Sequence, residues 1–153
     1  MSRRTALSGI AGRRSGVRVE GFLKSRDRRT VRAAITAALQ VLRAGRIEVD
    51  VHAVTQAHSR RLNRIFRGRR RPGDVLSFPL PSNAPGGPVG EMFLCPELVA
   101  RGAGRHGFTP RRWLAYLAVH GMLHLFGFDH RTPVEARRMD GLTRALRSAG
   151  PRR

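Results

Sequence analysis

The chain has little of what disulfide-bonded or membrane-spanning proteins need. Its 153 residues contain one cysteine, Cys95, so no disulfide can form within the chain, which suits a reducing compartment. The longest apolar stretches, such as Trp113–Val119, are far shorter than the ~20 residues that cross a bilayer. No apolar segment is long enough for a secretory signal, so we expect a cytoplasmic protein with no membrane partner.

Acidic residues are also scarce, since ten of them oppose 30 basic residues and the formal net charge is +20. Of the basic residues 29 are arginine, and Lys24 is the one lysine. A GC-rich genome explains arginine in place of lysine, but it does not explain the shortage of acids. Arginine binds phosphate bidentately and stacks on bases, so the charge predicts a polyanionic partner, most simply RNA or DNA. An anionic membrane is the main competing partner, but no basic amphipathic helix without a core role supports it.

The N-terminal region differs in composition from the rest of the chain. The first eighteen residues contain no acid and five arginines. An organellar transit peptide has a similar composition, but no continuous apolar face is visible, and residues 1–15 are predicted to be a disordered basic arm. Residues 16–150 are long enough for one domain with a single core and show no internal repeat, so we expect a single domain there.

Apolar periodicity predicts the secondary structure. Alternating patterns predict four strands, at Gly16–Gly21, Arg46–Val54, Asp74–Leu80 and Val89–Cys95. Helical spacing and turn residues predict five helices, at about Thr30–Arg43, Gln56–Phe66, Pro96–Ala103, Pro110–Phe126 and Pro133–Gly150, with loops at Arg67–Gly73 and Pro81–Pro88. The fourth of these helices is apolar around most of its circumference and should be the buried central one. The order predicts an α+β fold, a small mixed four-stranded sheet packed with about five helices.

Three of the six histidines lie within eleven residues, as His120, His124 and His130. On a helix, residues four apart project from the same face, so His120 and His124 can bind one ion. Gly127 can end that helix in a left-handed conformation and turn the chain back, which lets His130 approach from outside. Three imidazoles leave a tetrahedral zinc ion one position open for water, as catalytic sites do. The sequence therefore predicts one Zn²⁺ on a central helix, although the ligand set also suits nickel, copper or iron.

The histidine spacing is similar to that of the metzincin zinc peptidases, H-E-x-x-H-x-x-G-x-x-H, with one departure. Gly121 stands where that signature has a glutamate, which is the general base of zinc peptidases. Its absence argues against peptide hydrolysis. The other histidines, His52, His58 and His106, lie apart from the cluster and are interpreted as surface or packing residues.

Two further features are candidates for the chemistry. Asp129 could orient a ligand histidine or assist proton transfer to the metal-bound water, and a turn-forming role is the simpler alternative. Arg67, with Arg69, Arg70 and Arg71, forms a dense basic run just before a predicted strand. Such a run is usually a solvated loop, but a short sheet would here deliver it to the edge of a cleft.

Four stretches of the chain match the motifs of one family. His120–His130 matches H-G-x-L-H-L-x-G-[YF]-D-H throughout. Leu62–Arg67 is similar to L-N-x-x-[YF]-R, Asp74–Pro79 to [DN]-V-L-S-F-P, and Gly90–Cys95 to G-[DE]-I-x-I-[CS]. By these motifs the chain resembles the bacterial YbeY-type endoribonucleases, also called rRNA maturation factors, over nearly its whole length. Gly73 stands where that family usually has threonine.

The resemblance implies a zincin-like fold, a zinc ion held by His120, His124 and His130, and an arginine, Arg67, facing the substrate phosphate. The activity it implies is cleavage of single-stranded RNA, tied to 3′-end maturation of small-subunit rRNA and to ribosome quality control.

The sequence therefore favours a zinc-dependent endoribonuclease with rRNA and the ribosomal small subunit as partners. Zinc lowers the pKa of its bound water from about 15.7 toward roughly 7, and that water would attack the phosphodiester. Arg67 and Asp129 are the candidate catalytic residues, and Arg67 and residues 69–71 the candidate substrate-binding ones. Two alternatives stay open. One is a zincin-type peptidase, and the other is a non-catalytic ribosome-assembly RNA-binding protein with a structural metal.

Overall fold

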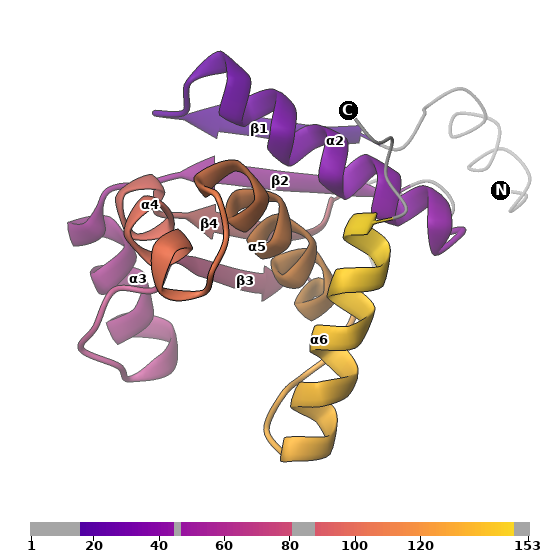
Figure 1. Ribbon diagram of the computed structural model, residues 1–153. Helices are drawn as coiled ribbons and strands as arrows, with labels where there is room; N and C mark the ends of the chain where they lie inside the picture. The colour runs from indigo at the N-terminus through magenta and orange to yellow at the C-terminus, as the bar shows by residue number, and fades with distance from the viewer. Residues whose placement is uncertain (1–15, 45–46, 81–87, 149–153) are drawn as a thin grey trace, which may run out of the picture.

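A computed structural model gives the structure of the protein and describes residues 16–44, 47–80 and 88–148. The predicted basic arm, the start of the second predicted strand at Arg46, most of the predicted loop before residue 88, and the predicted helix end at Gly150 lie outside the described residues. The elements are β1 (Gly16–Gly21), α2 (Ser25–Val41), β2 (Glu48–Ala53), α3 (Gln56–Arg67), β3 (Val75–Pro79), β4 (Pro88–Leu94), α4 (Pro96–Arg105), α5 (Pro110–Leu125) and α6 (Pro133–Ser148) (Figure 1).

The described strands form one mixed sheet in the order β1-β2-β4-β3. β1, β2 and β4 run parallel, and β3 pairs antiparallel with β4. With the five described helices this is the α+β fold with a four-stranded mixed sheet that the sequence predicts.

Helices α2 and α5 cover one face of the sheet, and α6 packs on α5 (Figure 1). One core lies between these layers, and the two central strands face it: β2 alternates buried and half-buried residues as predicted, and so do residues 89–94 of β4. In β3 the adjacent Leu76 and Ser77 are both buried, so that strand departs from the predicted alternation. Its fully buried side chains include Val31, Ile35, Val49, Val51, Met92, Met122 and Leu123. No helix within the described part of the chain is long and apolar enough to cross a membrane.

The predicted start of α2 at Thr30 is wrong, since the helix begins at Ser25. The first turn has no apolar periodicity, so the pattern could not show it. Its Arg28 instead donates to the backbone carbonyls of Val19 and Gly21 on β1. This contact with β1 stabilises the first turn of α2, which the sequence pattern does not predict.

Gly121 lets α5 approach β3 and β4 closely. A Cβ atom at this position would lie 2.6 Å from the Met92 methyl, 2.9 Å from Val75 Cγ2 and 3.1 Å from Ser77 Oγ. Ser77 Oγ also donates to the Gly121 carbonyl at 2.8 Å, in a fully buried bond. The residue that replaces the peptidase glutamate is therefore part of the helix–sheet interface.

We expect Gly121→Ala to destabilise the protein by about 1 kcal/mol, because overpacking of about 1–3 kcal/mol outweighs a helix-propensity gain of about 1 kcal/mol. The matched control is Gly141→Ala in α6, where a Cβ atom would meet nothing within 4 Å. That variant should gain up to about 1 kcal/mol. Thermal unfolding of the two variants measures the difference, and an equal gain in both would contradict the packing argument.

Candidate metal centre

The end of α5 places the histidines. The helix begins at Pro110, where Thr109 accepts a hydrogen bond from the Arg112 amide, and it ends at Leu125. Gly127 has a φ of 87°, which confirms the predicted left-handed turn. The chain then folds back along the helix and delivers His130 to the turns that carry His120 and His124.

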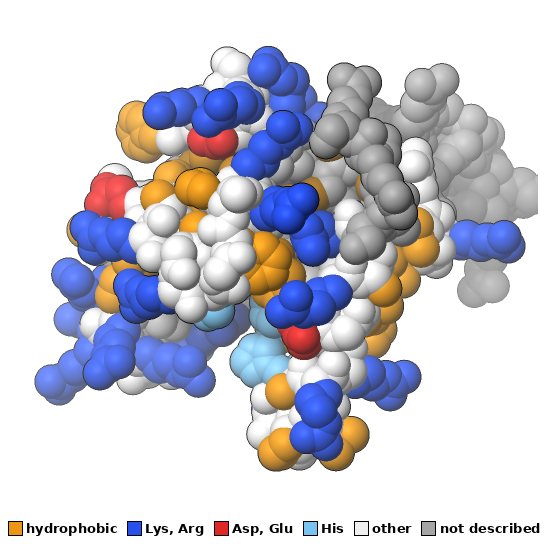
Figure 2. All heavy atoms as spheres, in the orientation of Figure 1, with side chains coloured by type: hydrophobic (Ala, Val, Ile, Leu, Met, Phe, Trp, Pro, Cys, Tyr) orange, Lys and Arg blue, Asp and Glu red, His pale blue; other side chains and the backbone are white. Residues whose placement is uncertain are grey.

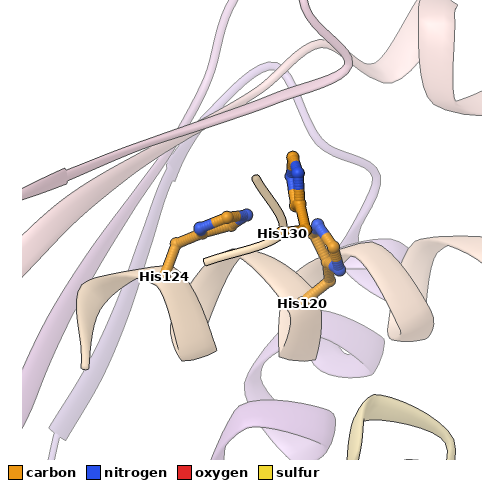
Figure 3. A group of neighbouring side chains, drawn as sticks. All are labelled: His120, His124 and His130. Carbon is orange, nitrogen blue, oxygen red and sulfur yellow. The ribbon is translucent and has the colours of Figure 1, made fainter. Parts of the chain in front are cut away.

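The three rings point toward one another (Figure 3). His120 and His124 rise from α5, and His130 enters from the segment after it. Their candidate ligand atoms lie within 4.8 Å of one another, and the ring centroids are 4.9–5.6 Å apart. Two nitrogens bound tetrahedrally to one zinc ion are about 3.4 Å apart, so the spacing of the three histidines is near what one ion requires. The three histidines could hold a metal ion.

The surroundings of the rings suit a metal as well. His120 Nδ1 is buried and has no hydrogen-bond partner among the described residues. Burial, and then the neighbouring His124 and His130, lower the pKa of His120 to about 4. Burial also lowers the pKa of His124, while its hydrogen bond to the Phe128 backbone opposes that shift. Neutral imidazoles with free lone pairs are the form that binds metal.

A tyrosine that the sequence did not single out supports the first histidine. Tyr116 stacks on His120 with ring centroids 5.9 Å apart and an interplanar angle of 18°. Its hydroxyl donates to Asp140 Oδ1 at 2.6 Å, and burial and this bond raise its pKa. The same bond lowers the pKa of Asp140, which also accepts from Arg144 Nε. The spacing of four between Tyr116 and His120 was visible in the sequence, but the partner on α6 was not.

Arg67 reaches the same place from the other side. It is the last residue of α3, not the first of a loop as predicted, and Gly68 ends the helix with a φ of 65°. Arg67 Nη2 donates to the Ser77 carbonyl at 3.2 Å, and the guanidinium lies 5.7 Å from the Phe78 ring centre. Burial and the charge of Arg69 lower the pKa of Arg67, but an arginine keeps its charge near neutrality.

The basic loop after Arg67 is tied to α3 by two buried residues. Ser59 Oγ donates to the Gly73 carbonyl at 2.6 Å and accepts from the Gly73 amide at 2.9 Å. The Asn63 side-chain Nδ2 donates to the Arg71 carbonyl at 2.7 Å, and the Asn63 backbone carbonyl accepts from the Arg69 amide at 3.2 Å. The Ser59 hydroxyl therefore reaches the position where the family usually carries a threonine. The sequence shows Ser59 and Asn63 four apart on a polar helix, but only the structure shows that both are buried.

The histidines open on a cavity of about 840 Å³ whose walls come from α3, β3, α5 and α6. Its lining includes Arg67 and residues 69–71, so the structure brings the predicted arginines and histidines together. A second cavity of about 600 Å³ shares Arg67, Ser77, His124 and His130 with the first and continues to Asp129 and Arg131. The candidate centre therefore lies where two hollows meet.

Asp129 makes the bonds of a turn residue. Its Oδ1 accepts from the His130 amide at 2.8 Å, and its Oδ2 lies 2.7 Å from Arg131 Nε. The bond from His130, followed by the charge of Arg131, lowers its pKa. A turn-forming role accounts for these contacts of Asp129. Its carboxylate also lines the second cavity.

The remaining histidines make packing contacts. His52 stacks on Phe93 at 5.1 Å, and His58 lies 6.3 Å from the same ring. His106 stacks on Trp113 at 4.2 Å, and both rings also line the larger cavity. His106 is thus closer to the metal centre than its place in the sequence indicates.

The lowered pKa of His120 gives the metal-free protein a pH dependence. Its folded pKa of about 4 lies below its ordinary value of about 6.5, so the unfolded chain binds this proton first as the pH falls. We expect the free energy of unfolding in urea to decrease from about pH 6.5 to pH 4, and His120→Gln to reduce that slope without removing it, because the pKa of His124 is lowered as well. The pKa values of the Asp129 and Asp140 carboxyl groups are lowered from an already acidic value, so these groups affect stability at a lower pH than His120 does. An equally steep curve in the His120→Gln variant would contradict this expectation.

Known proteins are similar to this chain in sequence and in fold. The family described as Endoribonuclease YbeY matches residues 19–149. A protein of that description from Aromatoleum aromaticum is 43% identical over 114 residues, which cover 74% of this chain and 72% of that protein. Another from Halorhodospira halophila is 40% identical over 107 residues, with 67% and 70% covered. The solution structure of TM1509 from Thermotoga maritima matches with a TM-score of 0.61 and 27% identity over 88% of each chain. Matches that span both the sheet and the histidine cluster show that the chain belongs to the Endoribonuclease YbeY family.

Proposed function

We propose that the protein is a zinc-dependent endoribonuclease that cuts single-stranded RNA. One observation carries the proposal: three histidines converge on the wall of a cavity of about 840 Å³ that arginines also line. The names of its relatives give RNA cleavage as their activity. The net charge of +20 supports a polyanionic substrate.

His120, His124 and His130 are the proposed zinc ligands. Three nitrogen donors suit zinc, and they leave one position open, as in catalytic sites. Bound zinc supplies a Lewis acid and a water with a pKa lowered to roughly 7. Burial keeps His120 and His124 neutral, and the Tyr116 ring stacks on the His120 ring and limits its rotation.

Arg67 is the proposed phosphate-binding residue at the reacting bond. Its guanidinium is fixed by the Ser77 carbonyl and the Phe78 ring, and it lines both cavities. A fixed positive group stabilises the charge that grows on phosphorus oxygens in the transition state. Residues 69–71 contact neighbouring phosphates, and Asp129 either orients the histidine segment or carries a proton at the second cavity.

The two cavities favour cleavage within a strand. They meet at Arg67, Ser77, His124 and His130, so a nucleic acid can continue on both sides of the reacting phosphate. An enzyme that removes terminal nucleotides would need one of these sides closed.

Two observations argue against the peptidase alternative. Gly121 packs on the sheet, so no side chain there can serve as the general base. Asp74 and Leu80 form backbone hydrogen bonds with Cys95 and Val89, on the side of β4. Because backbone bonding alternates along a strand, the N–H and C=O groups of residues 75, 77 and 79 point to the other edge of β3, which pairs with no described strand. On that edge the Val75 amide donates to its neighbour Asp74, the Ser77 carbonyl accepts from Arg67, and Pro79 has no N–H. An extended peptide that binds as an added strand would find these positions taken.

The number of ligands argues against the other alternative, a non-catalytic RNA-binding protein with a structural metal. Structural zinc sites are usually closed by four protein ligands. Within the described residues the cluster offers three, beside two cavities.

We propose that the substrate in the cell is rRNA. The protein would act in the cytoplasm on the small ribosomal subunit, in 3′-end maturation and in ribosome quality control. The basis is the motif resemblance together with family membership.

We expect His124→Ala to remain folded, to lose bound zinc and to lose cleavage of single-stranded RNA, because two histidines hold zinc poorly. His58→Ala is the matched control, since His58 is exposed and lies outside the cluster. Elemental analysis, circular dichroism and an RNA assay with and without a chelator measure the outcome. Cleavage that persists in His124→Ala, or in chelator, would rule out the metal mechanism.

We expect Arg67→Ala to lower kcat by about a hundredfold or more while zinc content stays unchanged. Arg67→Lys should be intermediate, because lysine keeps the charge but not the planar fork. The control is Arg61→Ala, since Arg61 is exposed on the same helix and lines neither cavity. Equal kinetics of Arg67→Ala and Arg61→Ala would remove Arg67 from the reaction.

A further inference from the structure

Helix α6 brings another arginine to the large cavity. Arg144 lines it together with the three histidines and Arg67. Arg67 reaches the cavity from α3, whereas Arg144 reaches it from α6, and its side chain is 54% exposed. Figure 2 shows arginine side chains on both sides of the histidines, over α3 and beside α6.

Arg144 is held in place from several directions. Its Nε lies 3.2 Å and 3.1 Å from the two carboxylate oxygens of Asp140. Its guanidinium carbon lies 5.6 Å from the Phe108 ring centre and 5.8 Å from that of Tyr116. Within the described residues both bonds to Asp140 use Nε, so the terminal nitrogens remain for a ligand.

The local charge near Arg144 stays positive despite Asp140. Arg147, one turn further along α6, places its guanidinium 5.6 Å from the same Phe108 ring. Two guanidinium groups thus lie at one ring beside a single carboxylate.

We propose that Arg144 is a second phosphate-binding residue, which contacts single-stranded RNA across the cavity from Arg67. The inference rests on the proposed function, because its ligand is the substrate named there. A guanidinium binds phosphate bidentately, and one already fixed by Asp140 and two rings loses little freedom on binding. With Arg67 on the opposite wall, the strand would be fixed on both sides of the metal centre.

The test compares Arg144→Gln with Arg137→Ala in the metal-loaded full-length protein. Glutamine keeps a donor for Asp140 but removes the charge, and Arg137 is an exposed residue of α6 that does not line the cavity. Fluorescence anisotropy with a short single-stranded phosphorothioate RNA, which resists cleavage, gives Kd at several salt concentrations. We expect Arg144→Gln to bind roughly tenfold more weakly. Its salt slope should fall by about 0.7, and Arg137→Ala should match the parent.

Asp140→Asn separates phosphate binding from a structural role, because it removes the ion pair and leaves the guanidinium. We expect this variant to melt at a lower temperature but to keep RNA affinity. A parental salt slope in Arg144→Gln, or equal losses of affinity and zinc in Arg144→Gln and Asp140→Asn, would overturn the proposal. Failure of the parent protein to cut RNA would instead refute the proposed function, and the binding assay would still decide the place of Arg144. If Arg144→Gln does not fold, Arg144→Lys should keep the parental salt slope but bind RNA more weakly, because lysine keeps the charge and loses the bidentate fork. Parental affinity in Arg144→Lys would then overturn the proposal.

Discussion

Helix α5 can lie against strand β3 because residue 121 has no side chain. Ser77 of β3 then connects the two walls of the candidate site. The Ser77 hydroxyl donates to the Gly121 carbonyl, and the Ser77 carbonyl accepts from Arg67. One residue of β3 therefore links the helix that carries His120 and His124 to the arginine across the cavity. A side chain at 121 would press on Met92, Val75 and Ser77 and so strain the contact between α5 and the sheet.

The positive charge of the protein acts on the histidine cluster and would also attract the RNA substrate that we propose. Burial is the largest cause of the lowered pKa of His124, and Arg67 contributes to it. The charge of Arg67 thus disfavours a protonated His124, which would repel a metal ion, and the arginines around the cavity together favour a polyanionic ligand. The nearby acids Asp129 and Asp140 are each paired with an arginine, so they orient guanidinium groups without reversing the sign of the cavity.

Much of this arrangement could be predicted where a local pattern decides it. The alternation of β2, the cap at Thr109 and the turn at Gly127 each depend on a few neighbouring residues, and the structure has them as expected. The start of α2 was missed because its first turn is stabilised by contacts to β1 rather than by its own periodicity. His106 was set apart because sequence distance hides its stacking on Trp113.

The sequence by itself determined the trio of histidines, the missing glutamate and the excess of arginine, because spacing on one helix and composition need no partner. Tertiary structure decided which groups face the trio. The bond from Tyr116 to Asp140 joins residues 24 apart, and the bond from Ser77 to Gly121 joins residues 44 apart. Such contacts depend on how helices pack on the sheet, and no local pattern of residues encodes that geometry.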